Sequence, residues 1–218
     1  MAKIVWDQTG ARLYETGTKN CVLYPQDETG AYPLGVAWNG VTAISQSPSG
    51  AEPSPLYADD IKYLELMSNE EFGCSIEAYT YPDEFAACDG SAELAPGVTI
   101  GQQVRKAFGL AYKTTVGNDV KGNDFGYKLH LIYGGKASPS EKSYATINDS
   151  PEAVTFSWEV TTTPVEVTGF KPTAYLCIDS TKVDATKLKA LEDALFGTES
   201  EEPHLPLPDE VASMMKTA

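Results

Sequence analysis

Residues 150–169 read SPEAVTFSWEVTTTPVEVTG and contain a clear strand pattern. Large apolar side chains alternate there with polar ones, as in a strand that buries one face. The apolar positions, which we predict to belong to the core, are Val154, Phe156, Trp158 and Val160. Pro164 lacks a backbone N–H and predicts the end of regular pairing. The polar face fits an enzyme, a binding module or an assembly subunit, so the remaining sequence has to separate these classes.

The composition indicates one acidic domain with many turns. The chain has 218 residues, of which 42% are hydrophobic, 18 are Gly and 14 are Pro. This is typical of a mainly β domain with short strands. The formal net charge of −15 argues against general affinity for nucleic acid and against docking on an anionic membrane. No apolar run approaches the roughly 18 residues of a membrane span. The first residues lack the apolar core of a secretory signal, so we expect synthesis in a cytoplasm.

Residue types that commonly carry catalysis or bind metals are scarce. Only two His are present, and no CxxC pair occurs, so a zinc site is not predicted. We expect reduced structural thiols at all four cysteines, which are Cys21, Cys74, Cys88 and Cys177. His130 is expected to be a strand residue facing a polar layer, and GGKAS at residues 134–138 lacks the spacing of a phosphate loop. The sequence therefore predicts no enzyme activity, no cofactor and no metal.

Most of the predicted elements are strands. Asn39-Gly40, between two β-prone runs at residues 35–47, indicates a hairpin. Further strands are expected over residues 62–68, 73–81, 104–119, 126–135 and 173–180, with one or two helical turns after Pro82. A helix is predicted between Asp184 and Gly197 from its cap, its stop and its apolar stripe. That stripe, also assigned to the core, is Leu188, Leu191 and Leu195. The predicted fold class is mainly β, a sandwich or barrel with one flanking α-helix.

Three segments have too little periodicity to be core elements. They are an N-terminal arm (residues 1–33), a Pro-rich long loop (48–60) and a flexible, acidic, Pro-rich C-terminal tail (198–218), so that a single domain spans residues 1–197. Such segments usually need a surface to lie on. A monomeric enzyme seldom carries so much of this chain, whereas a subunit that wraps its neighbours has a use for it.

Charge is unevenly distributed along the chain. Residues 59–93 contain ten acids and one base, and residues 105–142 contain seven bases and three acids. One interpretation is a solvated surface with random grouping. The other is a dipolar subunit whose acidic face meets the basic face of the next copy, a heterologous contact that builds rings or stacks.

Six pieces of the chain, in order over about residues 9–181, suggest a family. They are TGARLYETG, GVAWNGVTAISQSPSGAEPSPLYADDIKY, EAYTYPDEFAACDG, FGLAYKTTVGND, FGYKLHLIYGGKASPSEKSYATINDSPEAVTFSWEVTTTP and PTAYLCIDS. Together they resemble the major tail proteins of long-tailed, non-contractile bacteriophages, which are the subunits of the tail tube. Their order and combined length carry the resemblance, because no single piece is a diagnostic motif.

The resemblance implies a tail tube fold, a β-sandwich flanked by a helix. Six copies would close into a homohexameric ring, and rings would stack into a hollow tube whose lumen is lined by paired strands. DNA would pass through transiently without specific binding. The resemblance further implies contacts with other tail proteins, location in the virion tail after synthesis in the host bacterial cytoplasm, no membrane association, and no catalysis, cofactor or metal.

An acidic lumen would let DNA slide, because a basic one would release counterions and hold the phosphates tightly. We therefore predict that acids from the first acidic block line the channel. The predicted lumen-facing residues are Glu65, Glu70, Glu71 and Glu77. The arm, the long loop and the tail are expected to contact adjacent subunits and rings.

The alternative is a non-catalytic all-β binding module, such as a virion decoration or carbohydrate-binding domain. Exposed Tyr and Trp would be its ligand platform. The chain has 12 Tyr and 3 Trp, but most of them fall in strand patterns that indicate core.

Overall fold

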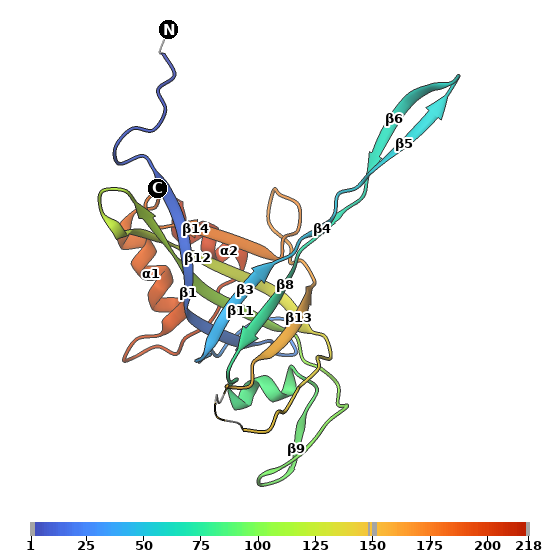
Figure 1. Cartoon of the computed structure of the whole chain (residues 1–218), viewed down its shortest axis with the longest axis vertical. Helices are drawn as coiled ribbons and strands as arrows, with labels where there is room; N and C mark the ends of the chain where they lie inside the picture. The colour runs from blue at the N-terminus through green and yellow to red at the C-terminus, as the bar shows by residue number, and fades with distance from the viewer. Residues whose placement is uncertain (1–2, 148, 150–151, 217–218) are drawn as a thin grey trace.

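One sheet of eight antiparallel strands forms the body of the protein (Figure 1). The computed structural model describes residues 3–147, 149 and 152–216 and is mainly β, with 44% strand and 12% helix. The strand order is β2-β1-β11-β12-β13-β8-β3, and β14 pairs with β12 off this path. The predicted mainly β fold class is confirmed.

The sheet strands are β1 (Leu13–Pro25), β2 (Val36–Ala37), β3 (Val41–Gln46), β8 (Gly73–Ala78), β11 (Phe108–Asn118), β12 (Gly122–Ala137), β13 (Phe156–Thr162) and β14 (Tyr175–Asp179). Three two-stranded pairs lie outside it: β4 (Ser49–Gly50) with β7 (Glu70–Glu71), β5 (Pro53–Ala58) with β6 (Ile61–Met67), and β9 (Ala92–Ala95) with β10 (Val98–Ile100). The helices are a short 3-10 helix (Asp83–Ala87), α1 (Ala185–Phe196) and α2 (Pro208–Met215).

Strand β12 joins the two halves of the sheet because its ends have different partners. Residues 128–132 lie between β11 and β14, whereas Gly135–Ala137 pair with β13. Its side chains alternate as the sequence predicts. Leu129 and Leu131 pack in the cluster that contains α1, and Ile132 packs in the cluster that contains Trp158.

The first apolar cluster surrounds Trp158 and draws side chains from both halves of the sheet. Trp158 is fully buried, and its ring centroid lies 5.1 Å from that of Phe85 and 5.6 Å from that of Trp38. Edge-on aromatic contacts of this kind add to the stabilisation from area burial. Val160 is also buried in this cluster, and Phe156 is half-buried against it.

The opposite face of β11 and β12 packs against the helices. Leu188, Leu191 and Leu195 of α1 are all buried in this second cluster. The Asp184 side chain accepts from the backbone N–H groups of Thr186 and Lys187, so it caps α1 as the sequence indicates. Val154, by contrast, is only half-buried and lies before β13 begins. Ser150 and Pro151, at the start of the stretch quoted first, lie outside the described residues.

The prediction that residues 1–33 form an arm outside the core is wrong for much of that segment. Residues 13–25 form β1, which pairs with β11, and Cys21 to Tyr24 are four consecutive buried residues. Cys21 and Leu23 join the first cluster, while Val22 and Tyr24 join the second. A strand buried on both faces shows no polar alternation, which explains why the pattern was absent.

The predicted hairpin at Asn39-Gly40 and the predicted loop at 48–60 also need correction. Gly40 has a φ of +77° and makes the turn, but β2 pairs with β1 while β3 pairs with β8. Residues 53–58 of the loop form β5, which pairs with β6 in a long projecting hairpin (Figure 1). Pro53 and Pro55 are tolerated because this strand is an edge.

The tail at residues 198–218 is ordered rather than flexible over its described part, and α2 is a second flanking helix. Leu205 and Val211 are buried in the second cluster. Leu205 lies directly on β11, since a Cβ on Gly109 would come within 2.3 Å of its Cδ2. Pro208 opens α2, and the Glu210 carboxylate accepts from the Leu207 N–H. The apolar partner that orders the tail is the chain's own sheet. Residues 1–2 and 217–218 lie outside the described residues.

The tail gives a matched pair of leucines for a stability test. We expect Leu205→Ala to lower the free energy of unfolding by about 2–4 kcal/mol, since it empties a buried site. Leu207→Ala should cost much less, because Leu207 is 37% exposed against 3% for Leu205. Urea denaturation of the two variants measures both values, and equal losses would contradict the packing described for the tail.

Candidate functional site

The β3–β8–β13 half of the sheet presents a polar face away from the core. In the strand register Ser157 lies opposite Glu77, and Glu159 lies opposite Ser75. Directly opposite residues share one face of an antiparallel pair. We call this surface the outer face and define it by Ser45, Ser75, Glu77, Ser157, Glu159 and Thr161, all of which are exposed or half-buried.

The outer face is acidic. Glu77 and Glu159 lie diagonally across β8 and β13, a relation in which Cβ atoms are typically about 7 Å apart. Within the described residues neither carboxylate forms an ion pair. Lys136 of β12 lies opposite Thr161, at the border of the face. The surface can therefore repel polyanions.

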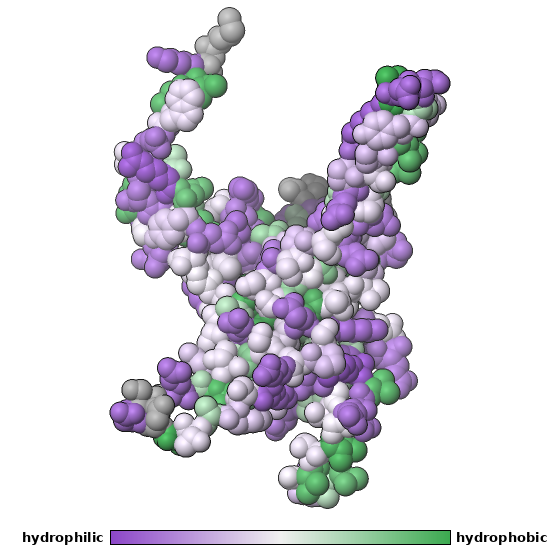
Figure 2. Space-filling model, turned by 45° about the vertical axis from the view of Figure 1, so that its right-hand side comes forward, coloured by the Kyte–Doolittle hydropathy of each residue, from purple (hydrophilic) through white to green (hydrophobic). Residues whose placement is uncertain are grey.

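The hairpin of β5 and β6, which we call the ribbon, projects from the strands next to this face. It continues outward from β3 and β8 through the short β4–β7 pair (Figure 1). Leu56 lies opposite Leu64 on one side of the ribbon, and Met67 lies opposite Pro53 on the other. Seven large apolar or aromatic residues of the ribbon are exposed, and green patches lie along the ribbon in Figure 2. They are Leu56, Tyr57, Ile61, Tyr63, Leu64, Leu66 and Met67.

The structure does not bring the four predicted lumen residues together. Glu77 lies on the outer face, whereas Glu65 lies on the ribbon and pairs with Lys62 at 2.6 Å. Glu70 and Glu71 form β7, in the stem of the ribbon. The sequence analysis missed Glu159 as the neighbour of Glu77. Alternation in residues 154–160 gives its exposed face, but only the β8–β13 register shows which side chains stand beside it.

Four of the seven bases in the block at residues 105–142 pair with acids of the same chain. Lys113 pairs with Glu192 of α1, and Lys128 pairs with Glu15 of β1. Arg105 and Lys142 both contact the buried carboxylate of Asp89, which also accepts from the Trp158 indole N–H. These four bases hold elements of the chain together, whereas the exposed Lys106, Lys121 and Lys136 form no ion pair within the described residues.

His130 is a buried structural residue and not an accessible base. Its ring stacks on Tyr112 with centroids 4.6 Å apart, and its Nδ1 lies 2.7 Å from the Tyr175 hydroxyl. Its Nε2 lies 2.8 Å from Thr114 Oγ1. Burial lowers the pKa of His130 from its ordinary value of 6.5, so the neutral ring is favoured. The polar layer expected around this strand residue is present.

The thiols show no sign of nucleophilic activation. Cys21, Cys74 and Cys88 are buried, and burial raises the pKa of Cys74 and of Cys88 to about 12. Burial also raises the pKa of Cys177, the exposed thiol. Across the described ranges no group of three or more His, Cys, Asp or Glu is placed to hold a metal ion. Neither α1 nor α2, nor any other helix in that part of the chain, is long and apolar enough to cross a membrane.

No protein-family model matches the chain, and no curated protein matches its sequence.

The buried histidine predicts a pH dependence of stability. Because the folded-state pKa of His130 is lowered, the unfolded chain binds a proton first as the pH falls through 6.5. The stability that the neutral ring contributes above pH 6.5 should therefore be lost as the pH falls towards the lower folded-state pKa. We expect the free energy of unfolding to fall more steeply between pH 7 and pH 5 in the wild type than in His130→Gln. Denaturant titrations at both pH values measure this difference, and identical slopes would contradict it.

Proposed function

We propose that this protein is a structural subunit that assembles with copies of itself into stacked hexameric rings, the tail tube of a long-tailed phage. The observation that carries the proposal is the ribbon, which exposes large apolar side chains on both of its sides. An isolated two-stranded hairpin is marginally stable in water, and exposed apolar patches mark interaction surfaces. The number of copies per ring follows the sequence resemblance.

Apolar surface at both ends of the molecule supports a stacked arrangement. The β9–β10 hairpin lies at the end opposite the ribbon and exposes Leu94, Val98 and Ile100 (Figures 1 and 2). Unlike surfaces at opposite ends favour heterologous, head-to-tail contacts, which build rings or open stacks. In such a stack the ribbon of one copy and the β9–β10 hairpin of another both lose their exposure to water.

The outer face supports a role as the channel wall. Its side chains are small, polar or acidic, and β3 at its margin is an edge strand of the sheet. Neighbouring copies that join at such edges would close the sheet and remove the unpaired backbone groups. Six copies of a chain with a net charge of −15 carry a formal −90 per ring. This charge keeps DNA phosphates mobile, since few cations are available to hold them.

The same stacked arrangement supports two further parts of the proposal, which are other tail proteins as partners and a location in the virion tail. The last ring at each end of a stack has one surface that no further ring covers. A tube of defined length therefore needs different proteins at its two ends, and these are the partners that we propose besides the chain itself and transiently passing DNA.

One observation favours the alternative, a binding module. Tyr57 and Tyr63 are each 70% exposed on the ribbon, and aromatic side chains of this kind can stack on a ligand such as a sugar. A binding module would remain monomeric while the two tyrosine side chains bind the ligand. Whether the protein assembles therefore distinguishes the binding module from the tube subunit.

Negative-stain microscopy of the purified protein at rising concentration tests the assembly. We expect rings or tubes of uniform width, and we expect Leu64→Asp with Leu66→Asp to abolish them, since charges on the ribbon would be buried at the contact. The melting temperature should change little, because the ribbon lies outside both apolar clusters. Thr186→Asp, at an exposed polar position in the first turn of α1 and away from the ribbon, is the control. A monomer at all concentrations would favour the binding module.

Charge reversal on the outer face tests the channel wall. Glu77→Lys with Glu159→Lys should still form tubes and should bind a short fluorescent DNA duplex, with an affinity that falls as salt rises. The wild type should not bind. Glu65→Lys with Glu71→Lys makes the same charge change on the ribbon and its stem and serves as the control. Fluorescence anisotropy measures binding, and stronger binding by the control pair than by the outer-face pair would contradict the assignment.

A further inference from the structure

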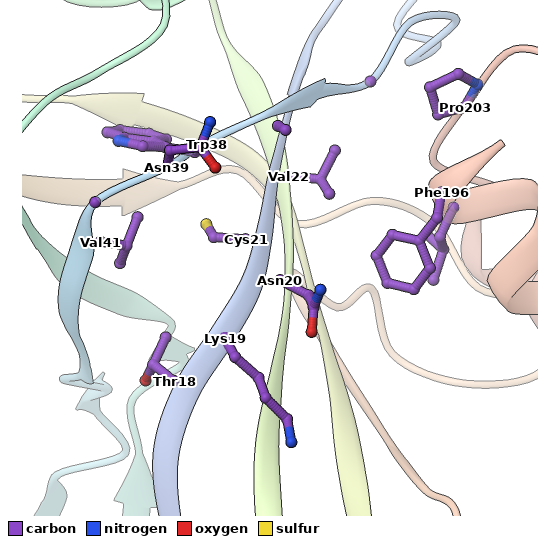
Figure 3. Close-up of a pocket in the computed structure, with 14 residues that line it drawn as sticks. Thr18, Lys19, Asn20, Cys21, Val22, Trp38, Asn39, Val41, Phe196 and Pro203 are labelled. Atoms are coloured by element: carbon purple, nitrogen blue, oxygen red, sulfur yellow. The ribbon is translucent and has the colours of Figure 1, made fainter.

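A groove with a volume of about 620 Å³ lies between β1, the β2–β3 turn and the C-terminal end of α1. Its size falls within the roughly 300–1,000 Å³ of small-ligand sites. Val22, Phe196 and Pro203 give it an apolar end, and Asn20 and then Lys19 follow along β1 (Figure 3). The groove is thus shaped for an apolar group that is followed by a polar or acidic one.

One wall of the groove is an unpaired strand edge. β1 pairs with β11 along one side. On its other side β2 pairs with Val22 and Leu23, and the Trp38 N–H donates to the Cys21 carbonyl, so the unpaired edge in the described structure lies before Cys21. The register of β1 shifts on both sides of Lys19, and both Gly17 (φ +72°) and Asn20 (φ +53°) have left-handed backbone. Bulges of this kind bend a strand and disrupt its pairing. An extended segment could add to this edge by backbone hydrogen bonds while its side chains fill the groove.

The leading segment, residues 3–9, has the properties that this groove requires. Its sequence KIVWDQT is apolar in the middle and acidic directly after Trp6. Trp6 is 75% exposed, Ile4 68% and Val5 62%, and the segment extends away from the body (Figure 1). A strand-prone run ending in an exposed Trp is the kind of anchor that dominates protein interfaces. With Trp6 in the apolar end, Asp7 would approach Lys19, which forms no ion pair within the described chain.

The segment cannot place Trp6 in the groove of its own chain. The N–H of Gly10 donates to Asp119 Oδ1, and its carbonyl accepts from the Asn118 side chain. Four residues separate Trp6 from this fixed point, so the Cα of Trp6 could run back along β1 for at most about 14 Å. Asn20 lies seven residues beyond the start of β1, a distance of about 23 Å along the strand. The occupant must therefore come from another molecule.

We propose that the groove receives the leading segment of a second copy, which adds to the unpaired edge of β1 and buries Trp6 between Val22, Phe196 and Pro203. The contact is heterologous, because the segment and the groove are different surfaces of the chain. It does not depend on the tube, since two copies of the chain are enough to form it.

Trp6 itself reports the contact, because the other tryptophans, Trp38 and Trp158, are buried. Acrylamide quenching is measured on the full chain over a concentration series, and a Trp6→Phe variant supplies the baseline to subtract. We expect Trp6 to change from freely quenchable to protected, with a blue-shifted emission, as copies associate. Trp6 that stays freely quenchable at every concentration overturns the proposal.

Groove-blocking variants test the receptor. Ala37 is exposed and lines the groove, so Ala37→Arg should keep Trp6 quenchable. Thr18→Arg, on the β1 wall, is a second blocking variant in case the first is unstable. Thr186→Arg, at the far end of α1, is the control and should behave as the wild type. Protection of Trp6 in both folded blocking variants overturns the proposal.

Complementation shows that the contact joins two chains. Trp6→Ala keeps an open groove and Ala37→Arg keeps an intact segment, so neither should pair alone but a mixture should form a one-to-one complex. Both variants also carry Leu64→Asp and Leu66→Asp, so that the ribbon takes no part. Sedimentation velocity measures the complex, and its absence from the mixture overturns the proposal. Tubes in which Trp6 stays exposed would contradict the groove contact but not the tube proposal. A two-chain complex without tubes would contradict the tube proposal but not the groove contact.

Discussion

The sheet formed by β1, β11 and β12 has to be covered on both faces, and this constraint organises the whole molecule. These strands carry large apolar side chains on each side. The α1 and α2 helices cover one face, and the β3–β8–β13 half covers the other around Trp158. Each covering layer buries its inner side and leaves an outer side free. The outer face, which carries Glu77 and Glu159, is thus the solvent side of a covering layer. Its side chains are not needed for core packing, so they are free to serve another function.

The sequence predicted the elements whose pattern is local. The alternation around Trp158 and the cap and leucines of α1 follow from side-chain order alone. What it did not predict depends on partners that are distant in the chain. The buried part of β1, Cys21 to Tyr24, showed no pattern because both of its faces are buried. The tail showed none because Leu205, which precedes α2, lies on Gly109 of a strand almost a hundred residues earlier.

The candidate site divides in the same way. Glu77 could be assigned an exposed position from its strand, but its pairing with the Glu159 region required the β8–β13 register. The prolines at 53 and 55 indicated a loop, because proline is rare in sheets. A two-stranded ribbon has two edges and no interior strand, so it accepts proline where a wider sheet would not.

Those prolines also affect aggregation of the unassembled chain, whose apolar ribbon is exposed to water. A free strand edge is a template on which other strands can add without limit. Pro53 and Pro55 remove two donors from the edge of β5, and Asp59 and Asp60 place like charges at its tip. The ribbon can therefore bind through its side chains while its backbone resists open-ended addition. These prolines and aspartates allow the apolar ribbon to remain exposed at high concentration without starting amyloid formation.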